Sequence, residues 1–132
     1  MCIFCNIINN EIPAYKIYET NSILAFLDIS AVTKGHCLVV PKKHVENIFD
    51  LPRDIAKEIM EATAIIANLL KTKLNIFNIN LLNNSGTLAG QTVMHFHLHI
   101  IPRYENDGIT FIPQENEPDF QSLAKIHQTI IN

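Results

Sequence analysis

Residues 95–101 constrain the fold more than any other part of the chain, because histidines and apolar residues alternate along this segment. Successive side chains of a β-strand point to opposite faces, so a strand here would place His95, His97 and His99 on one face. The apolar residues between them would lie on the other face and pack against a core. The alternation therefore predicts a strand with one chemically active face and one buried face.

The length of this predicted strand separates the roles of its histidines. At a rise of ~3.3 Å per residue, His95 and His99 would lie about 13 Å apart along the strand. They could not both bind one metal ion, because Zn–N bonds are only ~2 Å long. The row must then serve at least two places, such as a metal site at one end and a reaction centre at the other. The alternative is an exposed polar face that happens to carry three of the six histidines.

Length and composition predict one globular domain over residues 1–132, because 48% of the residues are apolar and 17% are charged. The net charge is -3 and no basic run is longer than two residues, so we expect no nucleic-acid partner. The first ten residues lack the pattern of a signal peptide, and the charge-free residues 74–102 are too polar to span a membrane. We therefore expect a cytoplasmic protein without membrane association.

Patterning elsewhere predicts strands joined by short connections, with helices set against them, which is an α+β domain. A long helix is expected at residues 51–74, where Asp50 could cap the first turn and Pro52 suits it. A second helix is expected near residues 119–131, and the intervening residues 103–118 should be irregular. The predicted strands are residues 15–19, 23–28, 36–40, 77–83 and 94–101. The apolar stripe of the long helix is Ile55, Ile59, Ala62, Ile66, Leu69 and Leu70.

A polar loop that contains two glycines, residues 83–92, leads directly into the histidine segment. Glycines allow a loop to turn its backbone N–H groups toward an anion, and Ser, Thr and Asn side chains add further donors. Most such loops are ordinary turns. The position of this one would place phosphate-binding donors beside a histidine nucleophile.

Three cysteines cannot all pair with one another. Cys2 and Cys5 form a C-x-x-C motif, which in a reducing compartment indicates a metal-binding or redox pair. Cys37 lies on the opposite strand face from His36, so we expect it to be a core residue.

The residues HFHLHII at 95–101 resemble the HφHφHφφ signature of the histidine triad (HIT) family, in which φ is apolar. The flanking residues AGQTVM at 89–94 and IPR at 101–103 are also similar to that family. Further segments resemble its Hint branch, in the bacterial-type variant with the C-x-x-C motif: Phe4 with II at 7–8 and EIP at 11–13, LAFLDI at 24–29, and GHCLVVPKKH at 35–44. The resemblance covers about residues 2–103 and leaves 104–132 unassigned.

The resemblance implies a HIT fold, built on an antiparallel sheet of about five strands with one long helix and shorter helices. It also implies a nucleotide hydrolase or transferase that acts at the α-phosphate of purine nucleoside phosphoramidates, like an adenosine 5′-monophosphoramidase, or of related conjugates. Dinucleoside polyphosphate hydrolysis and a nucleotide-binding regulatory role are the alternatives. The family usually forms homodimers, which join two sheets and pack the long helices together.

The resemblance also implies catalytic roles for the histidines. His97 would attack the phosphorus and form a nucleotidyl-histidine intermediate, which splits one displacement into two easier ones. His99 would bind a phosphate oxygen, and His36 would orient or polarise the site. No cofactor is required for this chemistry in the family. Neutral phosphate donors would come from Asn84, Gly90, Gln91 and Thr92, with Thr92 near the leaving group.

Two binding sites carry over from the family in the same way. Asp28 would accept hydrogen bonds from the ribose hydroxyls. The apolar residues expected to line the slot for the purine base are Ile3, Phe4, Ile7, Ile12 and Ile29, although each alone would be assigned to the core. The expected ligands of a structural zinc ion are Cys2, Cys5, His44 and His95, a donor set that suits tetrahedral Zn²⁺.

Overall fold

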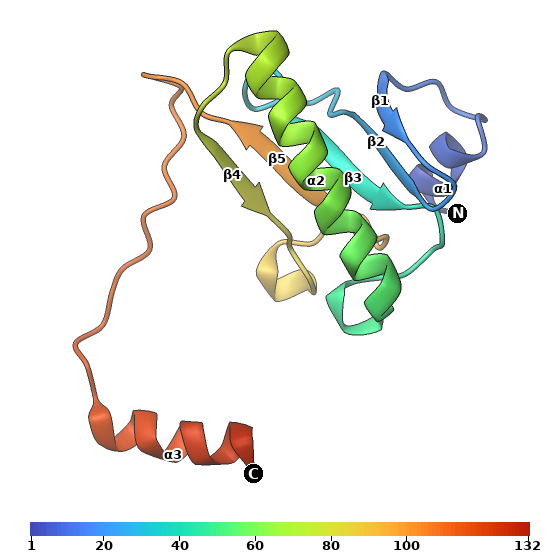
Figure 1. Cartoon of the computed structure of the whole chain (residues 1–132). Helices are drawn as coiled ribbons and strands as arrows, with labels where there is room; N and C mark the ends of the chain where they lie inside the picture. Colours follow the sequence, from blue (N-terminus) through green and yellow to red (C-terminus); the bar gives the residue numbers. More distant parts are fainter.

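The fold is built on one sheet that carries a helix on each face. The computed structural model describes residues 1–132 and arranges five strands in the order β1-β2-β3-β5-β4. All neighbouring strands are antiparallel, which confirms the predicted α+β class (Figure 1). The strands are β1 Lys16–Glu19, β2 Ile23–Leu27, β3 Cys37–Pro41, β4 Ile79–Leu82 and β5 Leu98–Pro102.

The central strand β3 shows how both faces of the sheet become buried. Cys37 and Val39 point into a core shared with helix α2, whereas Leu38 and Val40 point into a second core shared with the N-terminal helix. All four side chains are buried. Burial raises the pKa of the Cys37 thiol to about 12, so this cysteine is an inert core residue, as its strand position predicted.

Helix α2, Arg53–Leu74, covers one face of the sheet (Figure 1). The predicted apolar stripe packs there, except that Leu69 is 37% exposed. The predicted Asp50 cap is wrong, because Asp50 ends a short 3-10 helix, η1 Ile48–Asp50, and Pro52 occupies the N-cap position without a side-chain bond. Asn75 closes the helix in the left-handed conformation (φ 58°), which asparagine adopts more readily than most residues.

Helix α1, Ile3–Ile8, covers part of the other face and was not predicted. Its apolar residues recur with helical spacing, and Phe4 and Ile7 are buried against the sheet. The Cys2 sulfur accepts a hydrogen bond from the Cys5 N–H (3.4 Å) and so caps the first turn. The C-x-x-C motif is therefore part of the start of a helix.

Strand β5 begins at Leu98, so the prediction of a strand over residues 94–101 is wrong for its first four residues. Pro41 in the neighbouring strand has no N–H to donate, and its carbonyl accepts the Nε2–H of His95 instead (2.8 Å). On the other side, the Asn83 side chain donates to the His97 carbonyl (3.0 Å). Side chains thus replace the backbone ladder where the histidine segment enters the sheet.

The C-terminal part leaves this body of the molecule. Residues 103–119 form no helix or strand, as predicted, and helix α3, Phe120–Ile131, follows at the predicted position. The Asp119 carboxylate accepts the Ser122 N–H (3.1 Å) and caps this helix. No helix of the chain has the length and apolar character needed to cross a membrane.

Candidate active site

Although His95 and His97 precede β5, the alternation of side chains persists through the segment. Phe96, Leu98 and Ile100 all pack into the α2 core. The histidine rings lie on the side of the sheet that carries α1, where the Phe4 ring stands edge-on to His95 and His97 at 5.8 and 5.1 Å between centroids. The expected division into two faces is therefore present in the structure.

The protonation pattern of His97 suits a nucleophile. Its Nδ1 lies 2.8 Å from the carbonyl oxygen of His95, and because a carbonyl can only accept, Nδ1 must donate the proton. A neutral ring then carries its free lone pair on Nε2. The centroids of the His97 and His99 rings are 5.1 Å apart, so the two side chains face one reaction centre.

A chain of hydrogen bonds fixes the tautomer of His99. The Val32 N–H donates to His36 Nδ1 (3.2 Å), which leaves the proton of a neutral His36 ring on Nε2. That Nε2–H can donate to His99 Nδ1 at 2.9 Å. The remaining proton of His99 is therefore on Nε2, where it can donate to a bound phosphate oxygen.

Asp28 is the acidic neighbour of this pair. Its Oδ2 lies 3.6 Å from His36 Nε2, and its Oδ1 accepts the Ser30 N–H at 2.8 Å. Burial lowers the pKa of His36, and the Asp28 carboxylate opposes that shift. Burial, together with the rings of His97 and His36, lowers the pKa of His99 to about 4. Both rings are therefore neutral near pH 7.

We expect the His99 ring to titrate near pH 4 in the folded protein, below the ~6.5 of an exposed imidazole. Because the unfolded chain binds this proton more readily, His99 destabilises the fold as pH falls from ~6.5 toward 4. Asp28→Asn should lower the midpoint further, since the carboxylate raises the pKa. NMR titration of the ring nitrogens measures both midpoints. A His99 midpoint at or above 6.5, or a rise in the variant, would contradict this electrostatic arrangement.

An apolar slot adjoins the histidines. The structure brings all six residues expected to bind the nucleoside around one cavity of about 120 Å³. Phe4 belongs to this slot and also contacts His97, so one wall of the slot is next to the proposed nucleophile. Asp28 lies at the same cavity, while Ile29 is exposed at its edge. These residues are Ile3, Phe4, Ile7, Ile12, Asp28 and Ile29.

The loop at residues 83–92 is organised by Gln91. Both N–H bonds of its side-chain amide are used inside the protein, to the Glu46 carbonyl (2.7 Å) and the Val93 carbonyl (3.0 Å), and its oxygen accepts the Gly86 N–H (2.8 Å). The Gln91 side chain therefore has no free N–H for a phosphate in this structure, and the role of Gln91 as a phosphate donor stays a prediction. Its side chain shapes the loop.

Asn84 and Thr92 keep side-chain donors, whereas the Gly90 N–H donates to the Thr87 carbonyl (3.0 Å). The half-buried Asn84 carboxamide lies beside Gly90, which has φ +93°, a value that favours glycine. Thr92 is exposed and lines a separate cavity together with Cys2 and His44. The structure thus places Asn84 and Gly90 together and Thr92 closer to the Cys/His cluster.

The four predicted zinc ligands form a second cluster. Cys2 Sγ lies 3.3 Å from His95 Nδ1, Cys5 Sγ lies 3.4 Å from His44 Nδ1, and the two Nδ1 atoms are 3.1 Å apart. All four donor atoms lie within 4.8 Å of one another. Tetrahedral zinc with bonds of roughly 2.0–2.3 Å needs ligand atoms at such separations. His95 Nε2–H donates to Pro41, so its Nδ1 lone pair is free for a metal.

His95 connects the two clusters. Its ring belongs to the Cys/His cluster, while its backbone carbonyl accepts the proton of His97 Nδ1. Its side chain is fully buried, so its position is tightly fixed by its neighbours. The separation of roles expected from the spacing of His95 and His99 is thus present in the geometry: His95 faces the cysteines, and His99 faces His36.

The HIT domain family matches residues 9–106, most of the chain. The chain belongs to the HIT family. This HIT protein is 46% identical to the Protein hit of Bacillus subtilis, over 98% of this chain and 91% of that one. It is 38% identical to adenosine 5′-monophosphoramidase HNT1 of Saccharomyces cerevisiae, over 98% and 80%. It is 37% identical to adenylylsulfatase HINT3 of Arabidopsis thaliana, over 80% of this chain and 54% of that one.

Crystal structures of relatives share the fold. A HIT family protein from Bacillus anthracis superposes with a TM-score of 0.91 at 52% identity, covering 98% of this chain and 94% of that one. A family member from Bacillus subtilis gives 0.92 at 43% identity with the same coverage. A Zn-bound histidine triad family protein from Mycobacterium smegmatis gives 0.78 at 33% identity, covering 97% and 96%. Membership of the family is therefore supported by both sequence and fold.

Several residues that shape the site were not predicted. The Val32 N–H fixes the His36 tautomer, and Asn83 holds the His97 carbonyl while accepting the Ser85 hydroxyl (2.7 Å). Pro41 orients His95 through its carbonyl. Val32 and Pro41 act through their backbone groups, which leave no signal in side-chain chemistry. Asn83 lay in the predicted polar loop, but nothing distinguished it from its neighbour Asn84.

Proposed function

We propose that this HIT protein hydrolyses purine nucleoside 5′-phosphoramidates, or related nucleotide conjugates, at the α-phosphorus. One observation carries this proposal. The Nδ1 proton of His97 is donated to the His95 carbonyl, which leaves the Nε2 lone pair free beside the His36–His99 pair and the apolar slot. This arrangement combines a nucleophile, a neutral hydrogen-bond donor and a binding slot for a base.

In the proposed reaction, His97 Nε2 forms a bond to the α-phosphorus while the bond from phosphorus to the leaving amine breaks. The departing amine takes up a proton from solvent. Water then attacks the nucleotidyl-histidine and returns a proton to solvent, which releases the nucleoside monophosphate and restores the imidazole. The Nε2–H of His99 would donate to a phosphate oxygen as charge develops on it. The side chains of Asn84 and Thr92 would supply further neutral donors.

The substrate class follows from the slot and from the charge of the site. Asp28 would accept hydrogen bonds from the ribose, and the apolar side chains of the slot would hold the purine. None of the residues assigned to the site is a lysine or an arginine, which fits a phosphate of low charge better than a long polyphosphate. The relatives named as a phosphoramidase and an adenylylsulfatase support a nucleotide substrate.

We also propose that Cys2, Cys5, His44 and His95 hold a structural zinc ion. The donor set and its separations fit the metal, and one relative of known structure is zinc-bound. When bound, the ion would supply a rigid cross-link between the start of α1 and the histidine segment. The catalytic chemistry would be carried out by His36, His97 and His99 without a metal.

A panel of substrates tests the proposed activity. Adenosine and guanosine 5′-phosphoramidates should be hydrolysed by the purified protein with a higher kcat/KM than diadenosine polyphosphates, because the site offers neutral donors. Steady-state assays of product nucleoside monophosphate give the comparison. A preference for the dinucleoside polyphosphate would transfer the assignment to that branch of the family. Absence of turnover on every member of the panel would contradict a hydrolase.

A further inference from the structure

The proton on His99 Nε2 depends on the position of one backbone group. The Val32 N–H donates to His36 Nδ1 (3.2 Å), and the His36 Nε2–H donates to His99 Nδ1 (2.9 Å). If the Val32 N–H moved away, the proton of His36 could shift to Nδ1. His99 would then have to donate from its own Nδ1, which leaves its Nε2 without a proton. The Val32 N–H therefore decides whether His99 can donate to a phosphate oxygen.

The loop that carries Val32 has little burial of its own to fix it. Residues 29–35 lie between β2 and β3, and the only buried residue among them is Thr33, which is 9% exposed. Val32 itself is 53% exposed. The ends of the loop are joined, since the Asp28 N–H donates to the His36 carbonyl (3.0 Å). Its middle must therefore be held by contacts with other parts of the chain.

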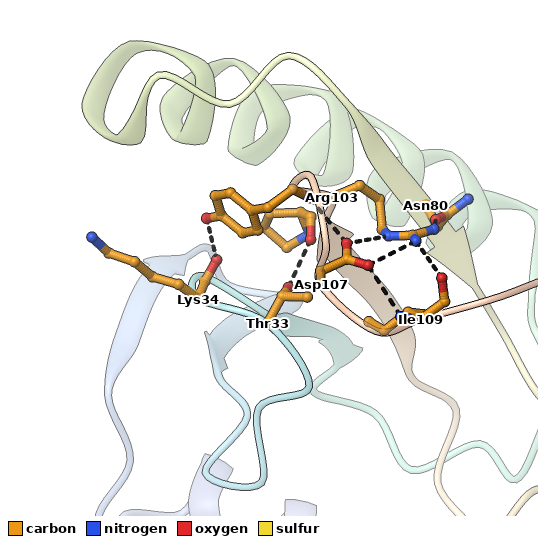
Figure 2. A network of polar contacts seen from close by, with 8 residues as sticks. Thr33, Lys34, Asn80, Arg103, Asp107 and Ile109 are labelled. Carbon is orange, nitrogen blue, oxygen red and sulfur yellow. Dashed lines mark hydrogen bonds and ion pairs between the residues drawn. The ribbon is translucent and has the colours of Figure 1, made fainter.

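Thr33 ties the loop to the end of β5 (Figure 2). Its hydroxyl donates to the Pro102 carbonyl at 2.7 Å, and both residues are buried. The ladder between β3 and β5 ends with Cys37 opposite Ile100, so Pro102 lies beyond the last pair. The Thr33 carbonyl in turn accepts the His36 N–H (3.1 Å). This first tether thus connects β5 to the backbone of the histidine whose tautomer is at issue.

Tyr104 supplies a second tether, from the residues that follow β5. Its hydroxyl donates to the Lys34 carbonyl (2.6 Å), and its backbone N–H donates to an oxygen of the Asp107 carboxylate (3.0 Å). The next loop residue, Gly35, has φ +92°, and a Cβ there would lie only 3.2 Å from the Pro102 ring. The loop is therefore held against the segment that continues β5 at three consecutive residues.

The base of the Tyr104 tether is held by a network of its own (Figure 2). Arg103 donates to both oxygens of the Asp107 carboxylate (2.8 and 3.1 Å) and to the side-chain oxygen of Asn80 on β4 (2.7 Å). Asp107 also accepts the Ile109 N–H (3.1 Å). The Arg103 guanidinium, together with the backbone N–H groups, holds the pKa of Asp107 well below its usual range, so the carboxylate stays charged at neutral pH. The phenol thus extends from a fixed point on the sheet.

We propose that Thr33 and Tyr104 are positioning residues for the reaction, because they hold the loop in the place where the Val32 N–H meets His36 Nδ1. Neither residue lines the nucleoside slot, and neither side chain bonds to a histidine. Their effect passes through the loop backbone to the tautomer of His36, and from there to that of His99. The inference rests on the proposed function, since the His99 Nε2–H affects turnover only if it donates to phosphate.

Variants of the buried tether test this role by kinetics. Thr33→Val removes the hydroxyl and keeps the shape of the side chain, whereas Thr33→Ser keeps the hydroxyl. Thr33→Val should lower kcat for a nucleoside phosphoramidate about tenfold with little change in KM, a part of the roughly 100-fold loss that follows removal of an oxyanion donor. Thr33→Ser should restore most of the activity.

Thr63→Val is the matched control. Thr63 is also buried, and its hydroxyl also donates to a backbone carbonyl at 2.7 Å, that of Ile59. It lies in α2, on the face of the sheet opposite the histidine rings, so its loss should leave kcat unchanged. Tyr104→Phe adds a second variant that opens no core, since Tyr104 is 37% exposed. In the Thr33→Val background it should lower kcat further.

Long-range ¹H–¹⁵N NMR of the imidazole rings reports the tautomers directly and needs no substrate. At neutral pH the wild type and Thr63→Val should show His36 and His99 protonated on Nε2. Thr33→Val/Tyr104→Phe should show part of each ring protonated on Nδ1. Unchanged tautomers in the double variant would overturn the proposal, and so would changed tautomers with wild-type kcat. If the wild type hydrolyses no phosphoramidate, the proposed function fails, and the tautomers then show separately whether the tethers hold His36.

Discussion

Replacing His97 with alanine should reduce the turnover of a nucleoside phosphoramidate by at least about 1,000-fold, because the nucleophile itself is lost. The fold should survive, since the neighbouring core residues Phe96 and Leu98 pack on the opposite side of the segment. Steady-state kinetics measured beside a thermal unfolding curve separates loss of chemistry from loss of structure.

Three further substitutions set the scale of this effect. His99→Ala and His36→Ala should each impair turnover less than His97→Ala, because they remove a phosphate donor and its orienting partner and leave the nucleophile in place. His127→Ala is the matched control, since His127 is exposed on α3 far from the site. A His97→Ala variant that kept more than about a tenth of wild-type activity would exclude covalent catalysis by this residue.

The double substitution Cys2→Ser/Cys5→Ser should remove zinc from the protein, reducing its content from about one ion per chain to nearly none. The stability that zinc adds should disappear with it. That contribution is about 4 kcal/mol when free zinc exceeds its dissociation constant a thousandfold. Elemental analysis and thermal unfolding measure the two effects on protein prepared without affinity-tag metals.

A chelator distinguishes loss of zinc from damage caused by the substitutions. Chelation should lower the Tm of the wild type toward that of the double variant and leave the variant unchanged, because the variant has no site to empty. In the wild type, chelation should also shift the NMR signals of the His97 ring, whose Nδ1 proton is held by the His95 carbonyl. Equal zinc contents in wild type and variant would contradict the four-ligand site.

The sequence predicted much of the sheet because its strands follow simple rules. Alternation of apolar side chains and short polar connections located four strands to within two residues at each end. The fifth was extended too far, since the pattern continues through His95 and His97 while the backbone ladder does not. The ladder stops before Leu98 because the Pro41 carbonyl accepts from the His95 ring and the Asn83 side chain donates to the His97 carbonyl. These contacts form only in the folded chain.

The helices show the same division between local pattern and tertiary context. The periodicity of α2 and the Asp119 cap of α3 are local features, and both helices were found. Asp50 is a good capping residue by type, yet the chain forms a separate 3-10 turn there, with Asn47 as its cap. Helix α1 has only six residues and was missed, because its short apolar pattern did not stand out.

The candidate site was predicted as residue types and not as hydrogen bonds. The two clusters follow from the spacing of the triad and from the family resemblance, and the structure assembles them. The tautomers of His36, His97 and His99 depend on backbone groups at Val32 and His95, which no sequence pattern identifies. The hydrogen bonds of the Gln91 side chain could not be predicted for the same reason, because its partners are carbonyls brought close by folding.

The covalent role of His97 is tested most directly by trapping the intermediate. Enzyme is mixed with a phosphoramidate labelled at the α-phosphate and quenched in base, because a P–N linkage survives alkali better than acid. The account predicts label on the peptide that contains His97, and none in the His97→Ala variant. With a substrate chiral at phosphorus, two in-line displacements predict overall retention of configuration. Net inversion without labelled peptide would show that water attacks phosphorus directly, and would contradict the account.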